Sequence, residues 1–172
     1  MRGLLITILS TVAVVVVVVL AGYVLSRDPS ALRSNHYNQL PETLRTSITD
    51  VELQPSWRAG LQSIQPGPFI HGLPSHVEVT TTGNVPYPAM EMVPPRKLLR
   101  QISDPKLPFG GWWTFEIEPA SPGATLRITE DGHLANPFFR FMPCFIFGHI
   151  SEIDRFLRAL CQKFNETPDI KG

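Results

Sequence analysis

The chain has 172 residues with 15 basic and 15 acidic side chains, so its formal net charge is zero. A near-neutral chain without a basic stripe is a poor binder of nucleic acid. Its two cysteines cannot form a disulfide framework or a cysteine-rich zinc site. At 43% hydrophobic residues it is not a disordered tail, and residues 27–172 suffice for one domain with one core.

An uncharged apolar segment covers residues 3–26 and contains six consecutive valines. As an α-helix, it is long enough to cross a hydrocarbon layer of about 30 Å. A cleaved signal peptide would have a shorter apolar region and an A-x-A-like cleavage site, which Ala21-Gly22-Tyr23 matches poorly. We therefore expect residues 1–26 to be a transmembrane anchor and the protein to be a single-pass membrane protein in contact with the lipid bilayer.

The orientation of this anchor depends on the basic residues that flank it. Arg2 precedes the apolar segment, whereas Arg27 and Arg33 follow it with Asp28 between them. The positive-inside rule therefore gives nearly equal counts on the two sides. We expect a cytoplasmic N-terminus, with the domain on the extracytoplasmic side.

The next part of the chain predicts a polar connection and a short helix. Residues 27–34 are expected to be a tether that merges into a first short strand. Pro41-Glu42 favours a helix over about 41–50, because proline is tolerated in a first helical turn and an early acidic residue suits the helix dipole. Pro55-Ser56-Trp57 ends this helical run.

Alternating apolar and polar residues then predict an antiparallel sheet with one buried face. The clearest strand covers 112–118, where Trp113 and Phe115 share one face. Residues 124–130 alternate in the same way, and Asp131-Gly132 is expected to form a turn. The other strand-like segments are 76–82, 89–93 and 97–103.

The final element is predicted to be a long amphipathic helix. From Ile146 to Phe164 the apolar residues recur at helical spacing, and charged residues occupy the opposite face. The resulting order is a short strand, a short helical excursion, five or six antiparallel strands and one long helix. This order predicts an α+β fold in which a curved antiparallel sheet grips the C-terminal helix, and an apolar cavity remains if the two do not fill the space between them.

Several short sequences resemble those of the START-like (SRPBCC) helix-grip superfamily, over residues 35–166. The superfamily resemblance rests on Pro41-Glu42-Thr43-Leu44, Ile48-Thr49-Asp50, Pro55-Ser56-Trp57-Arg58 and Pro94-Pro95-Arg96-Lys97-Leu98. A narrower resemblance, to membrane-anchored polyketide cyclase/dehydrase-like proteins, rests on 104–113, Thr129-Glu130-Asp131-Gly132, Asn136-Pro137-Phe138-Phe139-Arg140-Phe141 and Phe147-Gly148-His149.

This resemblance implies a helix-grip domain over residues 35–166, a tail over 167–172 and a cavity for hydrophobic ligands. It implies no particular reaction, because the superfamily includes lipid carriers, cyclases, hydrolases and binders without activity. The sequence departs from the resemblance at 66–76, which is rich in proline where a strand is implied. The sheet is expected to be interrupted there.

Aromatic side chains are the main candidates for contact with a ligand; ordinary core packing is the default explanation for such residues, and we expect some of both. Trp113, Phe115 and Met90 are expected to face inward. Arg140 could neutralise an acidic group on an apolar ligand; the alternatives are a surface arginine or a partner for Glu116 or Glu118. The candidate ligand-binding residues are Trp57, Met90, Trp113, Phe115, Arg140, Phe145 and His149.

Candidates for catalysis are few. His149 could act as an acid or base near neutral pH, and its alternative is a histidine at the edge of the core that bonds to the backbone. None of the five histidines has the spacing of a metal-binding pair, so no metal and no cofactor are expected. Glu130 and Asp131 are expected on a solvated turn and on opposite faces.

These observations leave three hypotheses. The favoured one is a membrane-tethered, non-enzymatic binder or carrier of a hydrophobic small molecule or lipid, with no nucleic-acid partner. The second is an enzyme of the cyclase, dehydratase or hydrolase type that acts on an apolar substrate. The third is a structural or interaction module with a filled core.

Overall fold

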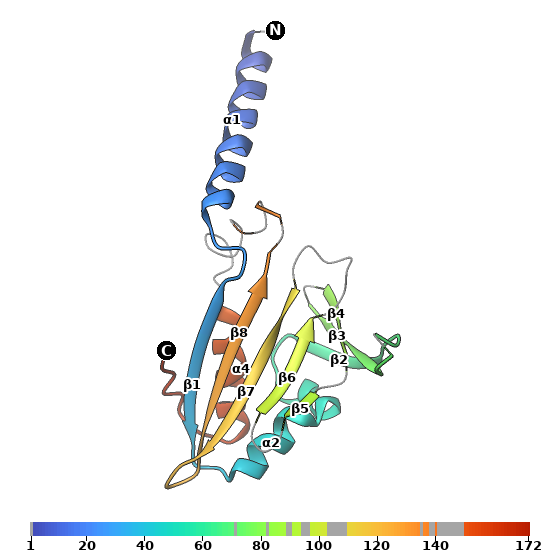
Figure 1. Cartoon of the computed structure of the whole chain (residues 1–172), viewed down its shortest axis with the longest axis vertical. Coiled ribbons are helices and arrows are strands. Elements are labelled where there is room, and N and C mark those ends of the chain that lie inside the picture. The colour runs from blue at the N-terminus through green and yellow to red at the C-terminus, as the bar shows by residue number, and fades with distance from the viewer. Residues whose placement is uncertain are drawn as a thin grey trace.

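The structure is a computed structural model that describes residues 2–70, 72–81, 83–88, 91–93, 97–102, 110–134, 136–137, 140 and 150–172. Its helices and strands follow the expected order, with seven described strands instead of five or six between the helical excursion and the final helix (Figure 1). The elements are helix α1 (Arg2–Val24), β1 (Ser30–Tyr37), α2 (Pro41–Thr49), the 3-10 helix η1 (Val51–Ser56), β2 (Leu61–Pro66), β3 (Ser75–Thr80), β4 (Gly83–Pro88), β5 (Glu91–Val93), β6 (Lys97–Ile102), β7 (Gly110–Pro119), β8 (Ala124–His133) and α4 (Ile150–Lys163).

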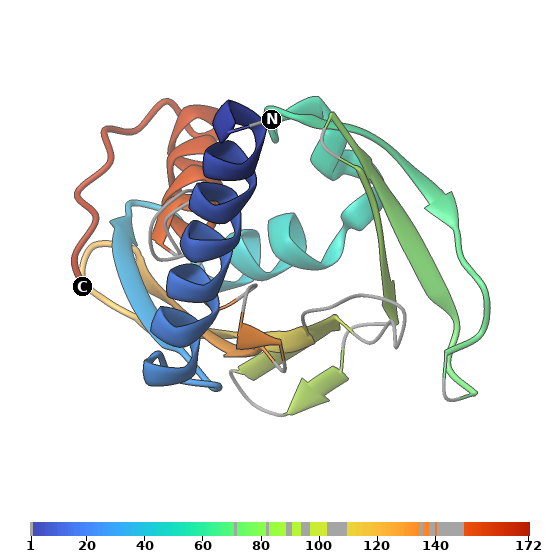
Figure 2. The ribbon, with the colours of Figure 1, turned by 90° about the horizontal axis from the view of Figure 1, so that it is seen from above.

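The strands form two antiparallel sheets. One has five strands in the order β1-β8-β7-β6-β5, and the other has three in the order β2-β3-β4. Seen from above, α4 lies over one part of the larger sheet, and β2–β4 turn away at the far side (Figure 2). The α+β helix-grip architecture predicted from the sequence is therefore confirmed.

The turn expected at Asp131-Gly132 is wrong, because β8 continues through both residues. Asp131 pairs with Trp112, and Gly132 pairs with Gly111. Gly111 has a positive φ of 145°, and a side chain there would collide with the Asp131 carbonyl. A residue without a Cβ allows the close approach of the two strands, so the Asp-Gly pair is accommodated within the sheet.

Two strands, β2 and β4, were not predicted. Both lie at the edges of the smaller sheet, where proline is tolerated because one side of the strand needs no ladder hydrogen bonds. Pro86 stands inside β4, and the register of β2 shifts between Leu61 and Ser63. The proline-rich stretch 66–76 contains the connection from the end of β2 to the start of β3.

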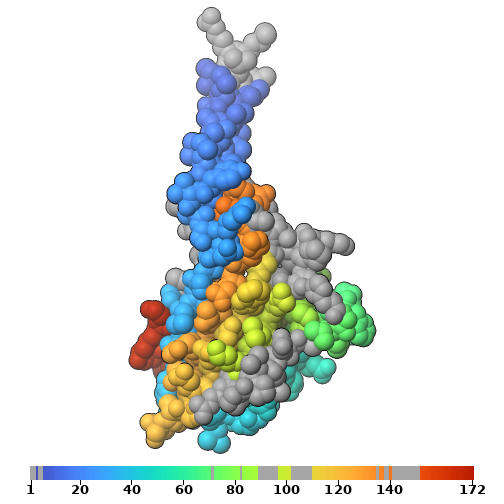
Figure 3. All heavy atoms as spheres, in the orientation of Figure 1, coloured from blue at the N-terminus to red at the C-terminus, as the bar shows by residue number. Residues whose placement is uncertain are grey.

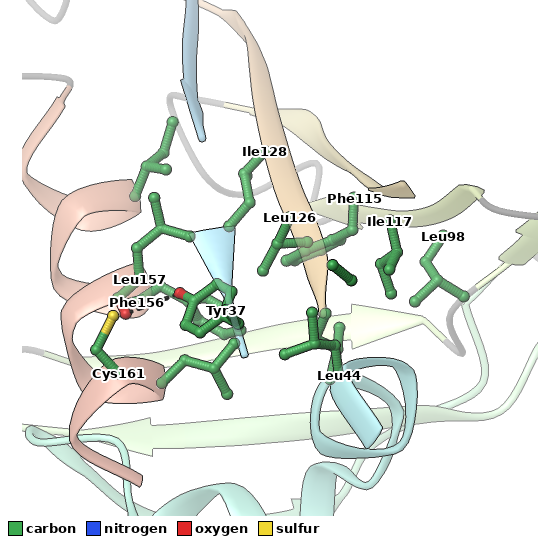
Figure 4. Close-up of a cluster of buried hydrophobic side chains, with 14 residues drawn as sticks. Tyr37, Leu44, Leu98, Phe115, Ile117, Leu126, Ile128, Phe156, Leu157 and Cys161 are labelled. Carbon is green, nitrogen blue, oxygen red and sulfur yellow. Dashed lines mark hydrogen bonds between the residues drawn. The ribbon is translucent and has the colours of Figure 1, made fainter. Parts of the chain in front are cut away.

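The hydrophobic core lies between the larger sheet, α2 and α4 (Figure 4). Tyr37 at the end of β1 is fully buried, and its hydroxyl donates a hydrogen bond of 3.0 Å to the Leu157 carbonyl of α4. The predicted C-terminal helix is present from Ile150; residues 141–149 lie outside the described part of the chain. The other core residues include Leu44, Ile48, Leu98, Phe115, Ile117, Leu126, Ile128, Ile153, Phe156, Leu160 and Cys161.

Helix α1 contains one stretch, Ile6–Val24, that is long and apolar enough to cross a membrane, and only 6% of it is buried. The helix projects from the rest of the molecule, and most of its described side chains are exposed (Figure 3). Near its end, Gly22 is buried and its backbone lies against Pro137. The last turn of this helix is therefore in contact with the folded domain.

The segment expected to be a tether, residues 27–34, is partly structured. Strand β1 begins at Ser30, so the second half of this segment belongs to the sheet. The first half is also attached, because the Leu134 amide donates a hydrogen bond of 2.8 Å to the Arg27 carbonyl. The connection between the apolar helix and the domain is thus short.

The C-terminal residues cover the free edge of β1. Ser34 and Lys171 exchange backbone hydrogen bonds of 2.8 and 2.9 Å, and the Asp169 amide donates one of 2.7 Å to the Asn35 side-chain oxygen. Exposed sheet edges tend to pair with other chains. Residues 167–172 protect this edge.

Candidate functional site

A cavity of about 540 Å³ lies between the smaller sheet, the adjoining end of the larger sheet and α4. This volume is within the range of sites that enclose one small molecule, roughly 300–1,000 Å³. Its wall combines apolar side chains with several charged groups. The lining residues include Leu61, Val85, Tyr87, Trp113, Phe156 and Ala159, together with Arg58, Glu78, Arg100, Glu130, Glu152, Arg155, Arg158 and Gln162.

Three of the lining side chains form one row across the larger sheet. In the strand register, Arg100 of β6 is opposite Trp113 of β7, and Trp113 is opposite Glu130 of β8. Directly opposed residues project from the same face of a sheet. A cation, an indole ring and a carboxyl group therefore stand side by side along one wall of the cavity.

Glu78 of β3 is the centre of a buried ionic cluster and is 2% exposed. Its carboxylate accepts a hydrogen bond of 2.7 Å from Arg58 Nη1, and Arg100 Nη2 pairs with the same oxygen. Burial alone would raise the pKa of Glu78, but the charges of Arg100 and Arg58 hold it below its ordinary value. The cluster therefore contains one ionised carboxylate and two guanidinium groups.

Arg100 is the most enclosed cation of this cluster, with 5% of its surface exposed. Its guanidinium lies over the Tyr87 ring, with 3.8 Å from Cζ to the ring centroid. This stacking uses one face of the group, and the bond to Glu78 uses Nη2. Arg100 Nε is buried and has no hydrogen-bond partner among the described residues.

The expectation that Glu130 lies on a solvated turn is wrong. The residue lies within β8, is partly buried and lines the cavity. Its Oε2 atom is buried without a hydrogen-bond partner in the described part of the chain. Burial raises the pKa of Glu130, and the neighbouring Glu152 charge acts in the same direction, while a hydrogen bond from Trp113 opposes them. The cavity thus contains a carboxyl group that takes up protons more readily than an exposed one.

The predicted aromatic residues fall in two places. Trp113 lines the cavity. Phe115 is fully buried in the core, and its ring centroid lies 5.6 Å from that of Phe156. Trp57 packs edge-on against the same ring at 5.5 Å. Trp57 and Phe115 therefore support the cavity wall through Phe156.

Arg140 lies away from this cavity wall. Its side chain is buried, with 4% exposed, and Nε donates a hydrogen bond of 2.8 Å to the Leu134 carbonyl. Its burial differs from the surface arginine considered as an alternative, and Glu116, one of the two acidic partners considered, forms an ion pair with Lys97. The remaining candidates, Met90, Phe145 and His149, lie outside the described residues.

Four lining residues, Arg58, Glu78, Arg100 and Glu130, were missed by reasoning from the sequence. A signal was present for two of them. The inward alternation of β8 through Leu126 and Ile128 continues to Glu130, and that of β6 through Leu98 continues to Arg100. The described residues contain no group of three or more histidine, cysteine or acidic side chains arranged to hold a metal ion.

Comparison with solved structures identifies the fold. No protein-family model and no curated protein matches the chain. A START superfamily protein from Mycobacterium smegmatis is similar over 81% of this chain and 98% of its own length, with a TM-score of 0.59 and 14% identity. For a protein from Mesorhizobium loti, the TM-score is 0.58 and the sequence identity is 17%, over 80% of this chain and 97% of the other. For a protein from Rhodobacter sphaeroides, the TM-score is 0.56 and the sequence identity is 19%, over 79% of this chain and 91% of the other. The chain therefore has a START-like helix-grip fold.

Proposed function

We propose that the protein is a membrane-tethered binder or carrier of a hydrophobic small molecule or lipid. The observation that carries this proposal is the cavity of about 540 Å³ between the sheets and α4. Leu61, Val85, Trp113 and Phe156 give it an apolar wall. Burial of apolar ligand surface against such a wall contributes roughly 25 cal/mol per Å² before the costs of association.

The anchor gives this cavity access to ligands that dissolve in the bilayer. Helix α1 contains the apolar stretch Ile6–Val24 and is joined to the domain through a short, hydrogen-bonded connection at Arg27. Tethering raises the effective concentration of a membrane-dissolved ligand at the cavity. We place the domain on the extracytoplasmic side. We also assign it to the polyketide cyclase/dehydrase-like branch on the strength of the sequence resemblance.

The test uses the full chain, purified in detergent and analysed by native mass spectrometry and organic extraction. We expect a stoichiometric apolar species on the wild-type protein. Ala159→Phe should displace it, because Ala159 is nearly buried on α4 and lines the cavity. Glu118→Phe adds the same ring at an exposed position at the end of β7 and serves as the matched control.

The outcome that contradicts this proposal is a bare wild-type protein that also ignores added lipids and apolar dyes. That result would favour the structural or interaction module instead. Equal retention of the ligand in Ala159→Phe and Glu118→Phe would mean that the bound species occupies another surface.

A second function, an enzyme acting on an apolar substrate, is favoured by one observation. Glu130 is a partly buried carboxyl group with a raised pKa inside the cavity, and groups of this kind serve as general acids or bases. The extracted ligand would be incubated with the wild-type protein and with Glu130→Gln. An enzyme would convert it to a species of different mass only in the wild type, whereas a carrier would return it unchanged from both.

A further inference from the structure

The charges around Glu78 do not balance. Arg58 and Arg100 both pair with this one carboxylate, which leaves one unit of positive charge in excess. Arg58 also donates a hydrogen bond of 2.6 Å to the Gln54 oxygen, which is neutral. A buried charge without a counterion is unfavourable, so this cluster is suited to receive one negative charge.

The hydrogen-bond donor of this cluster that lacks a partner belongs to Arg100. Its Nε is buried without a partner among the described residues, its side chain is 5% exposed, and the residue lines the cavity. Glu130 stands in the same row, but Trp113 separates the two. Glu130 Oε2 also has no hydrogen-bond partner in the described part of the chain, so it does not accept a hydrogen bond from Arg100. Among the described residues, Glu78 is the anion paired with Arg100, and the excess charge remains available for an added anion.

We propose that the cavity selects amphiphiles with a single carboxylate, which accepts a hydrogen bond from Arg100 Nε while the apolar chain lies against Trp113 and Phe156. This inference rests on the proposed binding function and specifies its ligand class. A single negative charge matches the excess on the cluster.

The experiment uses the full chain in phosphatidylcholine nanodiscs and dodecanoic acid labelled with ¹³C at the carboxyl carbon. Nanodiscs without protein define the resonance of acid in the lipid, and a second carboxyl resonance that grows with protein reports binding. Methyl dodecanoate with a ¹³C carbonyl is the uncharged probe. We expect the acid to bind at least about tenfold more tightly than the ester, since charge-assisted hydrogen bonds are about twice as strong as neutral ones.

Two substitutions with opposite expected signs test the role of the cluster. Arg100→Gln should weaken binding of the acid by about tenfold or more and leave the ester within about twofold. Glu78→Gln increases the positive excess and should strengthen binding of the acid. Arg127→Gln removes the same charge from the position on β8 between the inward-facing Leu126 and Ile128, and should change neither probe.

The outcomes separate this inference from the proposed function. If acid and ester bind equally well, and Arg100→Gln weakens both alike, the carboxylate preference is wrong although the cavity still binds apolar ligands. If neither probe gives a protein-bound resonance, both the inference and the proposed binding function are contradicted. If Arg100→Gln does not fold, the sign of the change in Glu78→Gln decides, and weaker binding of the acid would overturn the proposal.

Discussion

The inward face of the larger sheet carries two neighbouring rows of side chains with opposite chemistry. Each row crosses β6, β7 and β8, and the two rows are separated by two residues along each strand. The first row is apolar and almost completely buried, whereas the second faces the cavity and includes two charged groups. The first row is Leu98, Phe115 and Ile128, and the second is Arg100, Trp113 and Glu130.

The difference between the rows follows from what covers them. Phe115 and its neighbours belong to the cluster packed with α2 and α4, so their surroundings are filled by apolar side chains. The second row adjoins the space between α4 and the smaller sheet, which is not filled. A step of about 7 Å along a strand therefore separates the core from the binding site.

The largest expected effect on stability comes from the first row. Phe115→Ala should lower the free energy of unfolding by about 3–5 kcal/mol, because it leaves a void where the surroundings are closely packed. Trp113→Ala should cost less despite its larger side chain, because it already faces a cavity. Urea unfolding of both variants measures the difference. An equal or larger loss in Trp113→Ala would contradict the division into two rows.

The second largest effect on stability is expected at the ionic cluster around Glu78. Glu78→Ala leaves two guanidinium groups without their counterion and should cost about 3 kcal/mol at pH 7. The pKa of Glu78 is lowered in the folded state, so its contribution is present above the unfolded pKa and is lost as the pH falls through the folded value. The penalty of Glu78→Ala should therefore shrink on acidification. A penalty that is independent of pH between 7 and 3 would show that the charge is not responsible.

Glu130 should show the opposite dependence on pH. Its pKa is raised, so its stability contribution is greatest below the unfolded pKa and declines as the pH rises through the folded value. Glutamine does not ionise, so Glu130→Gln avoids the loss of stability that ionisation of Glu130 causes at high pH. The variant should therefore unfold at a higher temperature than the wild type near pH 8. Thermal unfolding at pH 8 and pH 4 measures this gain, which should disappear at the lower pH. A gain that is larger at pH 4 would contradict the assignment.

The smallest effect is expected at the rim of the cavity. Arg155 forms an ion pair with Glu152, and both side chains are largely exposed. Exposed pairs of this kind contribute little to stability, so Arg155→Gln should change the free energy of unfolding by no more than about 0.5 kcal/mol. A loss comparable to that of Glu78→Ala would mean that the rim is part of the folded core.

The sequence was sufficient to predict the inward-facing apolar residues of β7 and β8, including Trp113, but not the charged residues that stand beside Trp113. Phe115, Leu126 and Ile128 alternate with polar residues, and this pattern gave the buried face of β7 and β8 correctly. The edge strands β2 and β4 were missed because their prolines and irregular register hide the alternation. Their place at the sheet edges was not apparent without the pairing of the whole sheet.

The charged row was missed for a different physical reason. Hydrophobic periodicity treats a charged side chain as a mark of the solvent side, and Arg100 and Glu78 are charged residues that face inward. Their burial depends on partners from other elements, since Arg58, Glu78 and Arg100 meet only in the folded chain. A local sequence pattern does not show which distant residues will neutralise a buried charge. Met90, Phe145 and His149 stay predictions.

The central claim, that the row containing Trp113 faces a ligand cavity, can be tested with the full chain labelled with 5-fluorotryptophan in nanodiscs. Trp112 and Trp113 are adjacent in β7, but Trp112 is 47% exposed and Trp113 lines the cavity. Each ¹⁹F resonance is assigned by substituting one tryptophan with phenylalanine. Addition of dodecanoic acid should shift the Trp113 resonance and leave that of Trp112 unchanged. A shift confined to Trp112, or none at all, would contradict the claim.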